Sequence, residues 1–277
     1  MSNTLTRRGF VACGSIVPLM ALGACARGTS SPSSSLPAGA AAALAPEGRL
    51  RACINLGNPT LANRDSAGVV TGVSVDLATT LARRLGVPLE TIVVDAAAKS
   101  VETVKAGRAD VGFFAIDPKR SDGIAFTAPY VLIEGAYLVR QGSALTDNAQ
   151  VDRAGTRVMV GRGSVYDLYL TREVKAAQLM RAPTSPTVVD RFLAEDADVA
   201  AGVRQQLEAD AKRLPGLRVL PGRFMVIEQA MGLPAGRGEA ARAMLARFVE
   251  QAKADGLVAE SLVRNRIGGA LVAPAAA

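Results

Sequence analysis

Beyond residue 46, short apolar runs alternate with amphipathic stretches, and this alternation constrains the fold of the chain more than any other feature. The pattern is typical of an α/β protein in which a mostly parallel sheet is covered by helices. Residues 51–56 predict a first strand. An apolar residue then recurs at every fourth position between Val73 and Leu85, as on one face of a helix, and Gly86 followed by Pro88 predicts its end.

The same alternation continues along the rest of the chain. It predicts strands at 91–95, 109–114, 137–140, 157–160, 179–182, 199–201 and 218–220, and helices at 100–106, around Tyr166, Val189 and Gln206, and at 239–254. No second linker interrupts the pattern, so any separation into lobes has to come from the topology of the sheet.

The first 24 residues have the layout of an export signal. Arg7 and Arg8 supply positive charge, an apolar stretch follows at 10–22, and small residues come after it. A membrane-spanning helix needs about 20 apolar residues, and this stretch is shorter and contains Pro18. The paired arginines resemble a twin-arginine signal, and the general secretion route stays open because Ala12 stands where such motifs often have a lysine.

The signal ends in a sequence that resembles a bacterial lipobox, Leu22-Gly23-Ala24-Cys25. Cys25 is therefore the predicted lipidation site and the predicted N-terminus of the mature protein. The residues 25–46 are rich in Ser, Pro, Ala and Gly and predict a flexible tether between the lipid and a folded body. These features predict a lipoprotein that is anchored to a membrane outside the cytoplasm, in the periplasm or at the cell surface.

Composition excludes several classes of site. The chain has 3 cysteines and no histidine. Cys13 leaves with the signal and Cys25 is the lipid site, so Cys53 stands alone and is expected to be a small core residue. Without histidine, Ser-His and Cys-His nucleophile pairs are excluded, and no metal, no cofactor and no catalytic residue is predicted.

The charge of the chain indicates small anions as partners. The formal net charge is +7, and removing the two signal arginines leaves +5 for the mature part. Acidic residues are interleaved with basic ones throughout, so no nucleic-acid surface is expected, whereas a mild attraction for anions is.

Six segments occur in an order and spacing that indicate a known family. They are Leu50-Arg51-Ala52-Cys53, residues 72–77 (Gly-Val-Ser-Val-Asp-Leu), residues 106–111 (Ala-Gly-Arg-Ala-Asp-Val), Asp117-Pro118-Lys119-Arg120, residues 124–130 (Ile-Ala-Phe-Thr-Ala-Pro-Tyr) and Gly163-Ser164. Together they cover about residues 50–264 and resemble the bacterial extracellular solute-binding proteins of family 3, which serve polar amino acid ABC transporters.

The resemblance implies a two-lobed, type II periplasmic-binding-protein-like fold that closes on its ligand by hinge motion. The chain would cross the hinge twice, near Ile133 and near Glu228. Lobe 1 would comprise 47–133 and 229–277, and lobe 2 would comprise 134–228. The expected protein is a monomer that delivers a small anionic or zwitterionic metabolite to an ABC transporter permease.

The resemblance also places a ligand-binding site in the cleft. Members of the family use an arginine at the position of Arg120 to hold a ligand carboxylate, which a planar guanidinium matches with two donors. In lobe 2, Ser164 and the amide of Val165 would face Arg120 from the start of a helix, where backbone N–H groups attract anions.

Three departures from the family pattern bear on the ligand. The acidic residue that usually holds a ligand ammonium group falls here on Val203 or Arg204. An aromatic residue that often covers the ligand is replaced near Asn58, and Phe113 and Phe114 stand where serines often occur. If Arg204 faced the cleft, it would suit a ligand with two anionic groups or an acid without an amine; alternatively Val203 faces the cleft and Arg204 points to solvent.

Two other functions remain open at this point. Some dehydratases of prephenate-like acids share this fold, and Glu134 is the one carboxylate that the sequence nominates for such chemistry, although a hinge role for it is more in keeping with its position. A ligand sensor for a membrane receptor is the third alternative. The binding protein is the preferred interpretation, and an enzyme is not predicted.

Overall fold

The computed structural model describes residues 39–276. The predicted signal, the lipid site Cys25 and the first part of the predicted tether therefore lie outside the described residues. The described part is a mixed α/β fold with two lobes, and both lobes share one sheet, in the strand order β4-β1-β5-β11-β6-β9-β7-β8, with β10 and β12 paired to β6.

Lobe 1 is built on the first half of this sheet. Its strands are β1 (Leu50–Asn55), β4 (Leu89–Val94), β5 (Val111–Ala115), β11 (Met225–Pro234) and the first part of β6 (Ile124–Arg140). The strand β1 pairs in parallel with β4 and β5, whereas β11 is antiparallel to β5 and to β6. The helices of this lobe are α1 (Ala40–Leu44), α2 (Val73–Leu85), α3 (Ala97–Lys105), α7 (Glu239–Ala254) and α8 (Leu257–Arg264).

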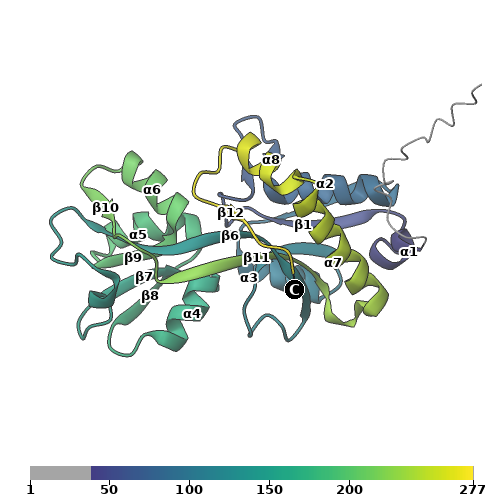
Figure 1. The fold of residues 1–277 in the computed structure, drawn as a ribbon. Coiled ribbons are helices and arrows are strands. Elements are labelled where there is room, and N and C mark those ends of the chain that lie inside the picture. The colour runs from purple at the N-terminus through teal and green to yellow at the C-terminus, as the bar shows by residue number, and fades with distance from the viewer. Residues whose placement is uncertain (1–38, 277) are drawn as a thin grey trace, which may run out of the picture. The chain divides into compact units, whose positions relative to one another are not determined.

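Lobe 2 continues the sheet from the second part of β6. Its strands are β7 (Arg157–Gly161), β8 (Gln178–Ala182), β9 (Val199–Val203) and β10 (Leu217–Val219), and its helices are α4 (Val165–Glu173), α5 (Val188–Ala194) and α6 (Arg204–Arg213). The strands β7, β8 and β9 run parallel to one another, and β9 is antiparallel to β6. Figure 1 shows α4, α5 and α6 grouped around these strands.

The short elements complete the chain. They are β2 (Asn63–Arg64) and β3 (Val70–Thr71), which pair with each other, the 3-10 turns η1 (Asn148–Gln150), η2 (Ser185–Thr187) and η3 (Ala235–Arg237), and β12 (Leu271–Val272). None of the helices found within residues 39–276 is both long and apolar enough to cross a bilayer.

Two long antiparallel strands connect the lobes. The strand β6 pairs with β11 in lobe 1 and with β9 in lobe 2, and Ile133 of β6 lies opposite Ile227 of β11. The C-terminal strand β12 pairs with β6 at the same level, with Leu271 opposite Leu132. The chain therefore passes between the lobes on paired strands, and this arrangement permits bending without breaking the sheet (Figure 1).

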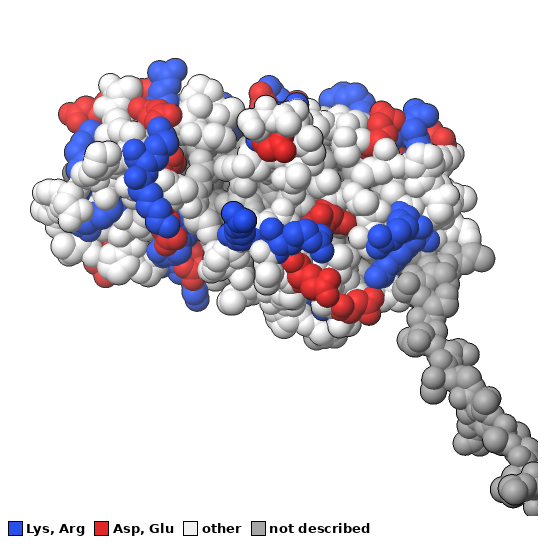
Figure 2. Space-filling view, turned by 90° about the horizontal axis from the view of Figure 1, so that it is seen from above, with Lys and Arg blue, Asp and Glu red and all other residues white. Residues whose placement is uncertain are grey.

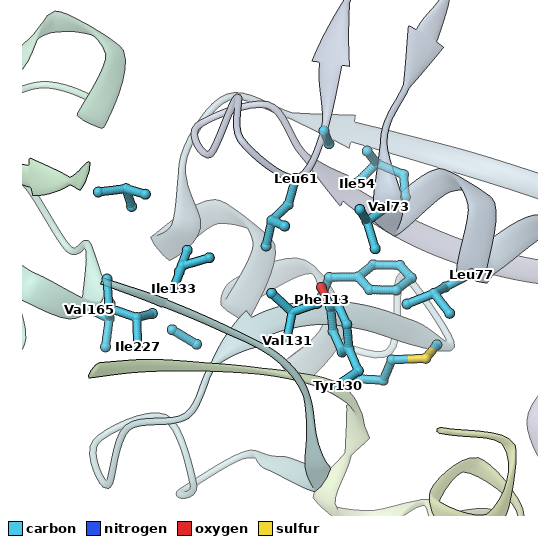
Figure 3. Packing of buried hydrophobic residues seen from close by; sticks show 14 of the residues in the cluster. Ile54, Leu61, Val73, Leu77, Phe113, Tyr130, Val131, Ile133, Val165 and Ile227 are labelled. Carbon is cyan, nitrogen blue, oxygen red and sulfur yellow. The ribbon is translucent and has the colours of Figure 1, made fainter. Parts of the chain in front are cut away.

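The largest apolar cluster includes residues of both connecting strands and continues into both lobes. Figure 3 shows Val73, Leu77 and Phe113 gathered near Tyr130, which belongs to β6. Phe113 meets Tyr130 edge to face, with the ring centroids 6.3 Å apart. Cys53 is fully buried, as predicted, and it belongs to a second cluster with Phe114 on the opposite face of the sheet.

The structure differs from the sequence-based prediction at the end of the tether. Residues 40–44 form α1, and Ala40, Leu44 and Ala45 are buried. The helix packs against α7. The predicted flexible segment therefore ends before Ala40, because its last apolar residues find a surface in the folded body on which to be buried.

Candidate ligand-binding cleft

A cavity of about 50 Å³ lies between the two lobes. From lobe 1 it is lined by Asn55, Asn58, Ser74, Phe113 and Arg120, and from lobe 2 by Ser164, Val165, Tyr166, Ser185 and Val203. Ile227 and Gln229 of the connecting strand β11 line it as well. This volume holds a few water molecules, so the two lobes are nearly closed on each other in this conformation.

A tight turn positions Arg120 at this cavity. Asp117, Pro118, Lys119 and Arg120 form the turn, in which the Arg120 amide donates to the Asp117 carbonyl oxygen over 3.0 Å. Aspartate at the first position and proline at the second favour such a turn. The Asp117 carboxylate accepts a further hydrogen bond from the Lys119 amide at 2.9 Å, which fixes the turn.

The Arg120 guanidinium is buried and has no carboxylate partner within the described residues. Arg120 is 6% exposed. Its Nη1 donates to the Ala115 carbonyl oxygen at 2.9 Å, and its Nη2 donates to the Gly163 carbonyl oxygen of lobe 2 at 3.1 Å. Burial lowers the pKa of Arg120 to about 10, and the negative charge of Asp117 acts in the opposite direction. The side chain is therefore still protonated at neutral pH.

An unpaired buried cation is costly, so an anion in this cavity would be favoured. Charged groups are seldom buried without a partner of opposite charge. The two carbonyl contacts occupy part of the five N–H donors of the guanidinium. A carboxylate in the cavity would supply both the missing charge and a bidentate acceptor.

The start of α4 forms the opposite wall. Ser164 is the N-cap of this helix, and its Oγ accepts from the Asp167 amide at 3.0 Å. Val165 and Tyr166 occupy the first turn, where backbone N–H groups have no acceptor within the helix, and both residues line the cavity. The lobe 2 wall therefore also favours negative charge.

Gly163 permits the close approach of the two lobes. Its φ is +68°, a left-handed conformation that favours glycine, and a Cβ added here would lie 3.1 Å from the Cβ of Ala98 in α3. The carboxylate of Asp167 accepts from the Gly163 amide at 2.8 Å and so holds the loop. A larger residue would both strain the loop and press against lobe 1.

A second contact across the cleft is an ion pair. Arg172 of α4 donates to Asp117 over 2.9 Å, and the Asp117 side chain is 1% exposed. Asp117 belongs to the turn that carries Arg120, so the partner of this carboxylate is Arg172 of the other lobe and not Arg120.

The remaining predicted residues of lobe 1 also reach the cavity. Asn58 lines it, and the Oδ1 atom of Asn58 is buried without a hydrogen-bond partner in the described structure. Phe113 and Phe114 line it too, but both are at most 5% exposed. The Phe114 ring packs against Phe126 at 6.0 Å, so most of this side chain belongs to the core.

Arg204 does not line the cavity, in contrast to its neighbour Val203. The Nε atom of Arg204 donates to Glu134 at 2.7 Å, and its Nη2 donates to the Gly222 carbonyl oxygen. Val203 ends β9 and is 6% exposed. Val203 therefore faces the cleft, as one alternative had it, but Arg204 does not point to solvent as that alternative expected, because it is held by Glu134. The other alternative, a second positive charge from Arg204 in the cavity wall, does not describe this structure.

Several residues that line the cavity were not predicted from the sequence. Gln229 and Ile227 lie on β11, a strand that was not predicted, and Ser185 lies in a short turn after β8. Tyr166 is 2% exposed, and burial raises the pKa of Tyr166 to about 12. The one sequence signal for Gln229 is its place next to the predicted crossing at Glu228.

Charge is distributed differently in the cavity and on the surface. Among the described residues that line the cavity, Arg120 is charged and there is no Asp or Glu. On the face shown in Figure 2, by contrast, basic and acidic side chains lie next to one another. Within residues 39–276 no group of three or more His, Cys, Asp or Glu side chains is placed to hold a metal ion.

Comparison with known proteins assigns the family. The model of the bacterial extracellular solute-binding proteins, family 3, matches residues 50–264. The chain therefore belongs to this family of solute-binding proteins. No curated protein sequence matches the chain significantly.

Solved structures with the same fold include two amino acid receptors. A solute receptor for L-cysteine from Neisseria gonorrhoeae is 22% identical, with a TM-score of 0.71, and the match covers 83% of this chain and 94% of that one. An amino acid ABC transporter substrate-binding protein from Streptococcus pneumoniae, bound to L-arginine, is 19% identical, with a TM-score of 0.70 and coverage of 82% and 97%.

A third similar structure has a relationship to an enzyme. It is an ancestral amino acid-binding protein described as a precursor of cyclohexadienyl dehydratase, with 19% identity, a TM-score of 0.67 and coverage of 79% and 95%. At these identities the structural matches establish the two-lobed fold of the chain, while the family assignment rests on the sequence model.

Proposed function

We propose that this protein is a lipid-anchored receptor that captures a small metabolite with a carboxylate group outside the cytoplasm and delivers it to the permease of an ABC importer. The observation that carries the proposal is the buried, carboxylate-free guanidinium of Arg120 in a cavity between two lobes. A ligand carboxylate would bind Arg120 from one side and the start of α4 from the other. Ligand binding would thereby hold the lobes closed.

The similar structures support a metabolite of amino acid size. Two of them are named for L-cysteine and L-arginine, and both ligands carry a carboxylate.

The environment of Glu134 supports a binding protein over a dehydratase. Arg223 and Arg204 hydrogen-bond to its two carboxylate oxygens at 2.9 and 2.7 Å. These hydrogen bonds lower the pKa of Glu134, so the carboxylate is kept ionised and is a poor proton donor. Glu134 is also not among the residues that line the cavity.

A thermal-shift screen tests the proposed function. Each carboxylic acid in the screen is paired with its neutral primary amide, which has nearly the same shape but no charge. A ligand at 100 times its dissociation constant stabilises the fold by about 2.7 kcal/mol. We expect at least one acid to raise the melting temperature while its amide does not; equal shifts with acids and amides, or none with any acid, would contradict an anion receptor.

Two further observations distinguish a receptor from an enzyme and an importer from a sensor. Ligand that is recovered unchanged after prolonged incubation supports a receptor, whereas product formation would support an enzyme. Loss of uptake of the bound acid on deletion of the gene supports an importer, whereas unchanged uptake with loss of a transcriptional response would support a sensor.

A further inference from the structure

The cavity has a positive charge with no negative charge beside it, and this balance defines a ligand class. We infer that the natural ligand is a small acid without an ammonium group, such as a 2-hydroxy acid, and that Val203 is a residue that determines this specificity. The inference rests on the proposed function, since it concerns the same cavity. It specifies the chemistry of the part of the ligand that Arg120 does not contact.

A zwitterion would bring its positive charge into this cavity without a partner. Arg120 is charged, and none of the described residues that line the cavity is acidic. An ammonium group held near a buried guanidinium is repelled, and it loses its water without gaining a carboxylate. A hydroxyl group at the same position needs hydrogen bonds alone, and the side-chain amides of Asn58 and Gln229 lie on the walls.

The nearby buried carboxylates are already engaged. Asp117 binds Arg172 and the Lys119 amide. Asp167 accepts from the Gly163 amide and from Arg181 at 3.0 Å.

The acidic residues of the connecting strands are engaged or turned away as well. Glu134 binds Arg204 and Arg223. Glu228 is exposed, and it lies between Ile227 and Gln229 on β11, so its side chain leaves the opposite face of the strand from those two lining residues. Asp117, Asp167 or Glu134 could therefore reach a ligand ammonium group only by breaking an existing contact. Glu228 could reach it only if β11 were distorted.

Val203 is the position at which an acidic residue would add a negative charge to the cavity wall. It lines the cavity, and it is also the N-cap of α6, with φ −67° and ψ 130° and no side-chain cap. Aspartate and asparagine are both preferred at N-caps, so either fits this backbone. Val203→Asp adds a negative charge to the wall, and Val203→Asn adds the same shape without the charge.

The experiment uses the purified protein without its signal and four matched pairs of ligands. The pairs are L-lactate and L-alanine, L-glycerate and L-serine, L-2-hydroxyglutarate and L-glutamate, and L-3-phenyllactate and L-phenylalanine. Within each pair a hydroxyl group replaces an ammonium group. Dissociation constants are measured by calorimetry for the wild type and for both Val203 variants.

The expected result is that the wild type prefers the hydroxy acid in the best-binding pair by roughly a hundredfold or more. Val203→Asp should shift this ratio toward the amino acid by at least tenfold, whereas Val203→Asn should not. Equal or tighter binding of the amino acid by the wild type would overturn the inference while leaving the receptor proposal intact. An unchanged ratio in Val203→Asp would overturn the role of Val203.

Failure of the proposed function gives a different result. If none of the eight acids, and none of the acids in the wider thermal-shift screen, binds the wild type, the anion receptor itself is contradicted. Equal binding of an acid and its neutral primary amide would also contradict the anion receptor. Both results are distinguishable from a reversed preference within a pair.

Discussion

Arg172 of lobe 2 and Asp117 of lobe 1 form an ion pair across the cleft, with Nη2 and Oδ2 2.9 Å apart. The Asp117 side chain is 1% exposed and that of Arg172 is 44% exposed. Opening of the lobes has to break this pair and the contact between Arg120 and the Gly163 carbonyl oxygen. The pair therefore acts as a latch that favours the closed state, and it leaves Arg120 free of its neighbouring carboxylate.

Removal of the latch should weaken ligand binding through faster dissociation. Arg172→Ala leaves Asp117 without its charged partner in the closed state, so we expect an affinity about five- to tenfold lower, which corresponds to about 1 to 1.5 kcal/mol. Stopped-flow measurement of the dissociation rate is the direct check. Arg191→Ala is the control, since Arg191 pairs with Glu195 within lobe 2. An equal effect of both variants on ligand dissociation would show that the ion pair between Arg172 and Asp117 does not stabilise the closed state.

Gly163 should be required for closure and not for folding alone. Gly163→Ala places a Cβ at 3.1 Å from Ala98 of the other lobe and adds left-handed strain of about 1 to 2 kcal/mol. Gly155→Ala is the matched control, because Gly155 has φ +86° and no atom within 4 Å of the added Cβ. Both variants should lower the melting temperature, but Gly163→Ala alone should reduce ligand affinity. Equal affinities in the two variants would show that Gly163 has no role in closure.

Asp110 should stabilise lobe 1 in a pH-dependent way. Its buried carboxylate binds Arg51 at 2.9 Å and Arg237 at 2.8 Å, and so connects β1 with η3, the turn that follows β11. Burial alone would raise the pKa of Asp110, but hydrogen bonds from Arg51 and Arg237 outweigh it and hold the pKa below its ordinary value. The contribution to stability is therefore fully present above the unfolded-state pKa and is lost as the pH falls through the lower folded-state pKa.

The measurement for Asp110 is the free energy of unfolding as a function of pH. Asp110→Asn should cost about 3 kcal/mol at pH 7, because the mostly buried guanidinium of Arg237 loses its carboxylate partner and that of Arg51 keeps only Glu47. The difference from the wild type should shrink below about pH 4. Asp122→Asn is the control, with a side chain that is 90% exposed and paired with Lys105; a difference for Asp110→Asn that does not depend on pH would contradict the account.

Cys25 remains the predicted lipid site, outside the described residues. Cys25→Ser should move the protein from the membrane fraction to the soluble fraction, because each buried CH₂ of an acyl chain contributes about 0.8 kcal/mol of membrane affinity. Fractionation and immunoblotting of cells that express each form give the comparison. A variant that is exported and cleaved normally but stays with the membrane would show that the lipobox interpretation is wrong.

The periodic parts of the fold were predictable from the sequence. The helix predicted at 239–254 coincides with α7, and the end of α2 falls at Gly86 with φ +69°. Both helices place a regular apolar face on the sheet, and α2 ends at a glycine in the left-handed conformation, so local sequence determines their limits.

The connecting strands were harder to predict. Residues 124–136 belong to β6, although Pro129 lacks the N–H group that a ladder requires. The pairing with β11 is irregular at Ala230, which lies opposite Pro129, and this irregularity accommodates the proline. Such a compensation depends on a partner 101 positions away along the chain, so no local pattern indicates it.

The residues of the proposed anion-binding half of the cavity were predictable from the sequence, whereas the residue that faces the cavity at the end of β9 was not. The turn at Asp117 and Pro118 and the helix start at Ser164 have local signals, and both reach the cavity walls. Whether Val203 or Arg204 faces the cavity depends on the residue at which α6 begins, and a shift of one residue exchanges the two. In the structure the hydrogen bond to Glu134 orients Arg204 toward β6, and this long-range contact has no local signal.

Arg120 is proposed to bind a ligand carboxylate between the lobes. This role is tested by calorimetric titration of the best-binding acid into the wild type, Arg120→Ala and Arg162→Ala. Arg162 is the control because it is an exposed arginine in the loop that carries Gly163. We expect Arg120→Ala to weaken binding by about 2 to 5 kcal/mol and Arg162→Ala to bind like the wild type. Equal dissociation constants for the wild type and a folded Arg120→Ala would contradict this role.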